Sequence, residues 1–137
     1  MNKQFWISGV VMSVVALIFG FIVHGLLLGD DYAAVQQLYR TPEESHGYFH
    51  FMVIAHVLFG FALTWIYRQG VDAGKSVVGQ GVRFGVAVAL LMTIPTYLIY
   101  YAVQPLPVAL VVKQIVFDTI AVVLLGIIVA ALNRPAR

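Results

Sequence analysis

An acidic side chain lies in the middle of the last apolar stretch of the sequence. Asp118 is near the centre of residues 106–132, and Gln114 lies four residues earlier, which places both on one side of a helix. A carboxylate at the centre of a membrane helix costs about 2.5 to 3.5 kcal/mol on insertion scales. Asp118 is therefore expected to face the interior of a helix bundle. It either joins helices by hydrogen bonds or binds a proton or a ligand.

Three histidines suggest a different chemistry. Bis-His ligation of a b-type haem needs two imidazoles that face one another from different helices at one depth. A rise of about 1.5 Å per residue puts His24 about 6 Å and His50 about 3 Å below the outer helix ends, so these two match best. His56 is deeper, at about 12 Å, and is the second choice of partner for His24. Thr96 and Tyr97 are expected at the depth of His56 and Gln114.

A metal site is the third possibility. His46 and His50 are four residues apart, a spacing that lets two imidazoles of one helix bind the same ion, and Glu43 is the nearest further ligand. Zinc or copper are the metals that this ligand set predicts. The pair occupies the exposed start of a helix, however, where solvated histidines are common. The simplest expectation is therefore that the chain holds no cofactor or metal.

Composition determines the class of protein. Hydrophobic residues make up 61% of the 137 residues and charged residues only 10%, whereas soluble domains carry about 25% charged residues. The chain is thus predicted to be an integral membrane protein. Cysteine is absent, which excludes disulfides, thiolate metal sites and iron–sulfur clusters. The eight Lys and Arg residues are dispersed and the net charge is only +2, so no basic patch suited to nucleic acid exists.

The elements that must position these residues are apolar helices. The sequence predicts a single all-α domain over residues 1–137, a transmembrane bundle of four helices at about 5–28, 42–68, 81–103 and 106–132. The segment Thr41-Pro42-Glu43-Glu44 has the pattern of a capping box and predicts a helix start. Between the first two helices, residues 32–40 predict a short helix lying along the outer, periplasmic surface. Pro95 is expected to distort the third helix.

Charge distribution predicts the orientation. Basic residues in short loops and tails favour the cytoplasmic side. Arg40 and Lys113 fall on one side of the predicted bundle, and six basic residues fall on the other: Lys3, Arg68, Lys75, Arg83, Arg134 and Arg137. Both termini are therefore predicted to be cytoplasmic, in a multi-pass protein of a bacterial inner membrane.

Rows of small residues predict close helix contacts. Gly81, Gly85 and Ala89 repeat every four residues, as do Gly126 and Ala130. Such rows let two helices approach closely in lipid. We expect them to pack within the bundle, with association with another membrane subunit or a second copy as the alternative.

Three functions are compatible with these patterns. No nucleophile with its base, phosphate loop or metalloprotease motif is present, so the sequence favours a non-enzymatic protein. The leading hypothesis is an accessory subunit or a bundle that binds a small, lipid-like ligand in a polar pocket of its outer half. The first alternative is a haem- or quinone-linked redox protein using His24, His50 and His56. The second alternative is a proton-coupled transporter of small solutes centred on Asp118. The residues expected to form the pocket are His24, His50, His56, Thr96, Tyr97, Gln114 and Asp118.

Overall fold

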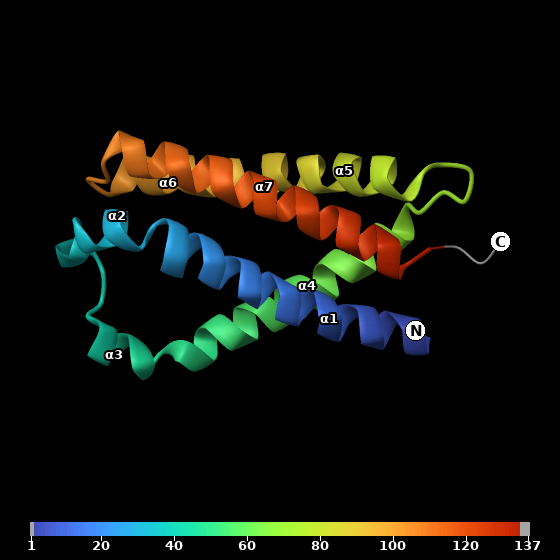
Figure 1. The fold of residues 1–137 in the computed structure, drawn as a ribbon, viewed down its shortest axis with the longest axis horizontal. Helices are drawn as coiled ribbons and strands as arrows, with labels where there is room; N and C mark the ends of the chain where they lie inside the picture. The colour runs from blue at the N-terminus through green and yellow to red at the C-terminus, as the bar shows by residue number, and fades with distance from the viewer. Residues whose placement is uncertain (1, 135–137) are drawn as a thin grey trace.

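The computed structural model describes residues 2–134, and these residues form helices joined by short connections (Figure 1). The elements are α1 (Lys3–Gly20), η1 (Phe21–Leu27), α2 (Gly29–Ala33), η2 (Gln36–Leu38), α3 (Pro42–His46), α4 (Phe49–Gln69), α5 (Val77–Val88), η3 (Ala89–Thr93), α6 (Ile94–Val103) and α7 (Val108–Leu132). The segments η1 and η3 are π-helices, and η2 is a 3₁₀-helix. The all-helical architecture predicted from the sequence is therefore confirmed over this range.

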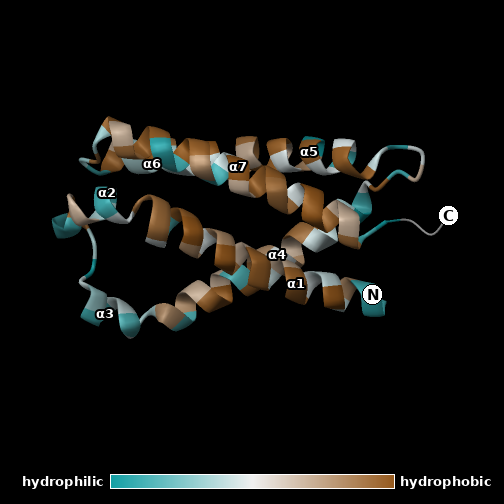
Figure 2. Ribbon diagram, in the orientation of Figure 1, coloured by the Kyte–Doolittle hydropathy of each residue, from teal (hydrophilic) through white to brown (hydrophobic). Residues whose placement is uncertain are grey.

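Four continuous helical stretches are long and apolar enough to cross a membrane. They are Lys3–Leu27, Phe49–Gln69, Val77–Val103 and Val108–Leu132. Hydrophobic residues cover these stretches, and hydrophilic residues gather in α2, α3, the α4–α5 loop and the chain start (Figure 2). We call the end that holds the start of α1 and the end of α7 the termini end, and the opposite end the α2 end.

The helix limits differ from the predicted ones in three places. The short helix expected over residues 32–40 is instead divided into α2 (Gly29–Ala33) and the 3₁₀-helix η2 (Gln36–Leu38). The helix expected over residues 42–68 is divided at Gly47 and Tyr48 into α3 and α4. Thr41 forms both hydrogen bonds of the expected capping box with Glu44, so this cap begins the short helix α3. The third stretch begins at Val77, earlier than predicted, because the Ser76 side chain accepts a hydrogen bond from the amide of Gly79 and caps α5.

The first close helix contact joins α1 to α4, which cross in Figure 1. A Cβ atom on Gly60 would lie 2.4 Å from the backbone nitrogen of Ser13, so only glycine permits this approach. Ser13 itself donates a 2.7 Å hydrogen bond to the carbonyl of Gly9. All of the buried residues of α4 lie in its second half, and its first half is exposed apart from the partly covered His56 and Phe59.

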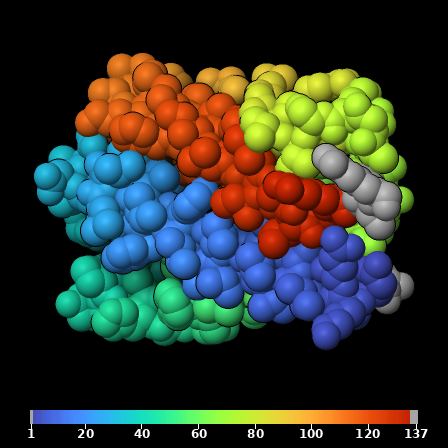
Figure 3. Space-filling model, turned by 45° about the vertical axis from the view of Figure 1, so that its right-hand side comes forward, coloured from blue at the N-terminus to red at the C-terminus, as the bar shows by residue number. Residues whose placement is uncertain are grey.

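The second close contact joins α5 to α7. A Cβ on Gly126 would lie 2.3 Å from the carbonyl oxygen of Gly81, and one on Gly85 would lie 2.5 Å from the Cα of Val123. Ala89 and Ala130 of the predicted small-residue rows are each 1% exposed. Both rows are thus buried inside the chain. The space-filling view shows α7 lying between α1 and α5 (Figure 3).

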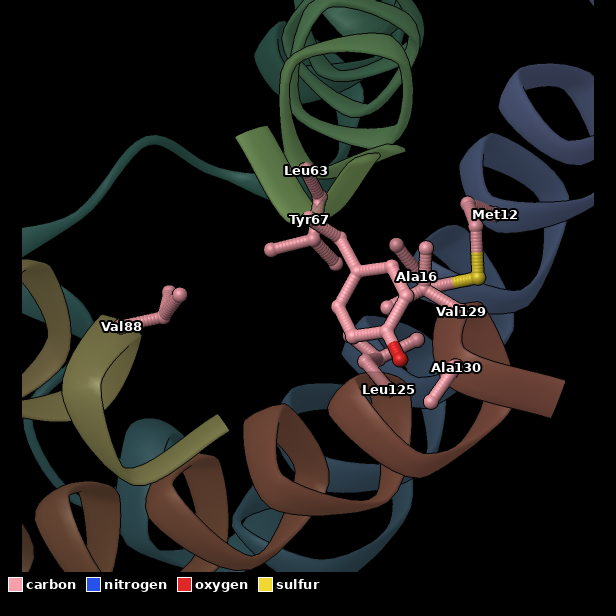
Figure 4. Packing of buried hydrophobic residues seen from close by; sticks show 8 residues of the cluster. All are labelled: Met12, Ala16, Leu63, Tyr67, Val88, Leu125, Val129 and Ala130. Carbon is pink, nitrogen blue, oxygen red and sulfur yellow. The ribbon is translucent and has the colours of Figure 1, made fainter. Parts of the chain in front are cut away.

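Two apolar clusters fill the interior. The cluster toward the termini end brings together Met12, Ala16, Leu63, Tyr67, Val88, Leu125, Val129 and Ala130, and the Tyr67 ring points toward α1 and α7 (Figure 4). The cluster at the α2 end consists of Val23, Leu28, Val35, Leu106, Leu110 and Val111. Leu28, the residue after the first membrane-length stretch, is 0% exposed, and Tyr32 of α2 packs against this cluster.

A buried hydrogen-bond network, the Asn133 network, joins α1, α4 and α7 at the termini end. Asn133 donates to the Ser8 hydroxyl over 2.7 Å, and that hydroxyl lies 3.4 Å from the hydroxyl of Thr64. Arg68 donates over 3.2 Å to the amide oxygen of Asn133. These small polar groups connect three helices where the backbones are close.

Candidate functional site

Asp118 of α7 is the centre of a group of polar side chains at the α2 end. It accepts a hydrogen bond from the hydroxyl of Tyr97 in α6, and its Oδ2 lies 3.3 Å from Nε2 of His24 in η1. Its side chain is 18% exposed and that of His24 is 37% exposed. Protein atoms therefore cover most of the carboxylate, and the partly exposed imidazole connects it to the surface.

The π-helical backbone of η1 positions His24. The amide of Leu28 donates to the carbonyl of Val23, five residues earlier, over 2.9 Å. A π-helix contains more residues per turn than an α-helix, and single π turns occur often at functional sites. The extra residue turns His24 toward α7 while Val23 stays in the buried apolar cluster.

Tyr32 of α2 completes the group, which we call the His24 cluster: His24, Tyr32, Tyr97, Gln114 and Asp118. The Tyr32 oxygen lies 2.8 Å from Nδ1 of His24 and accepts a 2.9 Å hydrogen bond from Nε2 of Gln114. Burial is the main reason that the pKa of Tyr32 rises to about 12, although the Gln114 hydrogen bond lowers it. The phenol is therefore protonated at neutral pH and acts as a donor.

The hydrogen-bond partners of Tyr32 determine which atom is the donor in each bond of the cluster. Because the Tyr32 oxygen accepts from Gln114, its own hydrogen is available for Nδ1 of His24. The imidazole then carries its hydrogen on Nε2, which faces the carboxylate of Asp118. The chain of groups from Tyr32 through His24 to Asp118 can pass a proton between the α2 end and the interior.

An ion pair and aromatic contacts hold α2 over the cluster. Lys113 lies 2.8 Å from Oδ1 and 3.0 Å from Oδ2 of Asp31. The Tyr39 ring meets the Tyr32 ring edge-on, with centroids 5.3 Å apart. The ion pair is partly exposed and contributes about 1 kcal/mol at most, so burial of Leu28 and Val35 carries most of the attachment.

One buried acceptor of the cluster has no partner. Gln114 is 4% exposed, and its Oε1 accepts no hydrogen bond from the described residues 2–134. Thr119 Oγ1 is the other buried side-chain atom in this range without a partner. A buried unpaired polar atom costs about 1 to 3 kcal/mol. A donor on a bound molecule or a water would remove this cost at Gln114.

An apolar groove of about 260 Å³ lies between α1 with η1 on one side and α7 on the other, and its walls include none of the five residues of the His24 cluster. Its walls are Phe19, Ile22, Val23, Leu27, Phe117, Ile120, Ala121 and Leu124. Val23 precedes His24 in the chain, and Phe117 precedes Asp118. The groove also opens to the surface, because Ile22 and Ile120 are 38% and 54% exposed.

Four of the residues predicted from the sequence meet in the cluster: His24, Tyr97, Gln114 and Asp118. Thr96 is exposed, and so is His50, whose ring packs on Phe51 with centroids 4.2 Å apart. His56 pairs with the carbonyl oxygen of Met52 over 2.7 Å.

The metal candidates do not form a cluster. His46 and Glu43 are exposed, as is His50, and no group of three or more potential ligands occurs in the described part of the chain.

Tyr32 is a site residue that the sequence pattern does not predict, and the contact between His24 and Asp118 is a second difference. A first helix that ends at Leu28 predicts that His24 lies well outside the depth of Asp118. In the structure the two side chains lie 3.3 Å apart, and His24 is on the π-helical turn η1. The aromatic residue directly after Asp31 was the available signal for Tyr32.

Comparison with models of protein families, with curated proteins and with solved structures found no match.

Proposed function

We propose that this chain is a multi-pass membrane protein that binds, without chemical conversion, a lipid-like molecule with a hydroxyl-bearing head. Support comes from the apolar groove between η1 and α7 together with the Gln114 acceptor of α7, which is buried without a hydrogen-bond partner among residues 2–134. The head would donate a hydrogen bond to Gln114, and the apolar tail would lie between η1 and α7.

The physical chemistry favours an amphiphilic ligand over a purely polar one. The groove walls are apolar throughout, and burial of apolar surface contributes roughly 25 cal/mol per Å². A small polar solute would leave those walls uncovered. A pure hydrocarbon would leave the Gln114 oxygen unpaired, so the ligand needs both parts.

Photocrosslinking tests this proposal. A hexadecanol probe that carries a diazirine in its chain should label the purified protein, and unlabelled hexadecanol should compete. Gln114→Leu should reduce labelling about tenfold, because one lost hydrogen bond to a buried acceptor corresponds to roughly 1.4 kcal/mol. Ala121→Phe fills the groove and should have a larger effect, the complete loss of labelling.

Two matched variants serve as controls. Gln4→Leu removes a glutamine that bonds to the carbonyl of Leu132 at the termini end, and Ala131→Phe adds a ring at an exposed position of α7. Both should leave labelling unchanged. Equal labelling of the parent and Gln114→Leu, or equal labelling by a headless hexadecane probe, would remove the proposal.

We further infer that the termini end faces the cytoplasm, in a bacterial inner membrane, and that α2 lies at the periplasmic surface. Support comes from the six basic residues expected on the cytoplasmic side against two on the other. A cysteine at Gln37, an exposed position two residues after Val35, should react with an impermeant reagent added outside intact cells. A cysteine at Ala73 should react only after cell lysis. The reverse pattern would overturn this orientation.

A second candidate function is proton-coupled transport, favoured by the chain of groups Tyr32, His24 and Asp118. Its test is the infrared carboxyl band of Asp118, identified by its absence in Asp118→Asn. A band that changes with pH in step with solute uptake by proteoliposomes supports this function. A band that never changes removes it.

The haem-linked alternative requires a larger change. His24 would have to leave both Tyr32 and Asp118 before it could ligate iron. A Soret band in the purified protein that is lost in His24→Ala would support it.

A further inference from the structure

A second pocket lies at the termini end, between the last turn of α4 and the first turns of α5. Its volume is about 320 Å³, and its walls are Ile66, Tyr67, Gly70, Asp72, Lys75, Gln80, Arg83, Phe84 and Ala87. The wall combines apolar side chains from both helices with polar side chains from the connecting loop. This arrangement fits the boundary between hydrocarbon and head groups in a membrane.

The loop that forms the polar wall is held in place by side chains. Gln80 accepts a 2.8 Å hydrogen bond from the amide of Asp72 and donates over 2.8 Å to the carbonyl of the same residue. It also donates over 3.3 Å to the carbonyl of Lys75. The Asp72 carboxylate accepts from the amide of Gly74 over 2.8 Å. Although this loop is rich in glycine, its conformation is specified by these contacts.

Arg83 is the residue that requires a partner. It lies about 9 Å along α5 from Val77, inside the third membrane-length stretch, and it is exposed. Within the described residues Arg83 has no ion pair and no side-chain hydrogen bond, whereas Lys75 lies 3.2 Å from Asp72. A guanidinium near the end of a membrane-length helix extends toward the head groups, where its charge is solvated.

We propose that this pocket binds the head group of an anionic phospholipid, with the phosphate between Arg83 and Lys75 and the start of an acyl chain against Phe84 and Ile66. Guanidinium groups bind phosphate through paired hydrogen bonds, and basic pockets between membrane helices select anionic head groups. The carboxylate of Asp72 offsets one of the two basic charges, and the wall keeps a net charge of +1 from Asp72, Lys75 and Arg83. The hydrogen bond from Gly74 and the contact with Lys75 hold its pKa below the usual value, so Asp72 stays ionised and positions the Lys75 ammonium group.

Native mass spectrometry of the detergent-solubilised protein tests the proposal. Dioleoyl phosphatidylglycerol should bind more tightly than dioleoyl phosphatidylcholine, which has the same chains and no net charge. Arg83→Gln should weaken phosphatidylglycerol binding about fivefold, and Arg83→Gln with Lys75→Gln about thirtyfold, since each basic group near the surface contributes about that factor. Arg83→Lys keeps the charge and should retain most of the binding.

Controls separate this site from general attraction to lipid. Arg40→Gln removes a basic group at the α2 end and should leave the affinity unchanged. Inorganic phosphate at the lipid concentration should not displace the lipid, because it lacks the acyl chains. Equal affinity for the two lipids, displacement by phosphate, or full binding by the folded double variant would each overturn the proposal. If the double variant does not fold, Arg83→Gln and Lys75→Gln are measured separately. Full binding of phosphatidylglycerol by both single variants would then overturn the proposal.

Discussion

Polar side chains connect α1 and η1 to α7 at both ends of the molecule, but the two groups are built differently. In the Asn133 network, small neutral groups and one arginine satisfy one another where backbones are close. In the His24 cluster, titratable groups meet, the imidazole is partly exposed, and the Gln114 acceptor has no partner among residues 2–134. The Asn133 network therefore serves helix packing, whereas the His24 cluster contains a buried acceptor without a partner among residues 2–134.

The largest expected effect concerns the packed region. Gly126→Ala should lower the free energy of unfolding by about 3 kcal/mol, because its Cβ would lie 2.3 Å from the carbonyl of Gly81 and α5 and α7 would have to separate. Unfolding in mixed micelles measures this. The matched change Gly70→Ala meets no atom within 4 Å and should be nearly neutral. Equal stability of the two variants would contradict the close α5–α7 packing.

The next effect concerns the His24 cluster. Asp118→Leu should destabilise the bundle by about 1 to 2 kcal/mol, since it leaves the Tyr97 hydroxyl and the His24 imidazole without their shared acceptor. Asp118→Asn retains an acceptor and should cost no more than about 0.6 kcal/mol. The same unfolding assay applies. If Asp118→Leu is as stable as the parent, the carboxylate does not hold the helices together, and its role in proton transfer or ligand binding becomes the stronger explanation.

A smaller effect is expected in the Asn133 network. Ser8→Ala removes contacts with Asn133 and Thr64 and should cost about 0.6 kcal/mol, the average for hydrogen bonds between membrane helices. Ser45→Ala, at an exposed position of α3, is the matched control. Ser8→Ala should also leave labelling by the hexadecanol probe unchanged, because the two polar groups lie at opposite ends. A loss of labelling would show that the two ends are coupled.

The smallest effect concerns the ion pair above the cluster. A double-mutant cycle of Lys113→Gln and Asp31→Asn should give a coupling of about 0.5 kcal/mol that decreases with added salt, as for other partly exposed pairs. Coupling that persists at high salt would indicate that α2 is held more rigidly than the apolar contacts alone require.

The positions of the helices could be predicted from the sequence more accurately than which side of each helix faces the interior of the bundle. Long apolar stretches follow directly from composition, and Gly81, Gly85 and Gly126 identify a close contact. Thr96 and Tyr97 illustrate the limit. Both were candidates for the pocket, yet Tyr97 contacts Asp118 and Thr96 is exposed. In lipid the outer face of a helix is as apolar as its packed face, so hydrophobic periodicity does not reveal which of two neighbours turns inward.

The positions of some site residues depend on backbone geometry that the sequence pattern does not specify. Asp118 and Gln114 were recognised because a polar group in an apolar helix is costly. Tyr32 was missed because its role depends on how α2 folds back over the bundle, a tertiary arrangement without a local signal. The contact between His24 and Asp118 depends on the π-helical backbone of η1, which helix length alone does not predict.

The π-helix η1 makes the contact between His24 and Asp118 sensitive to chain length as well as to residue type. Deleting one residue within Phe21–Leu27 would return this segment to an α-helix and rotate His24 relative to α2 by about 100°. The helix would still be apolar and long enough to span a membrane, and α1 would still pack on α4. A chain one residue shorter would therefore keep the helix bundle, but its His24 imidazole would no longer face Asp118. Insertion or deletion of a single codon is enough to create or remove this contact.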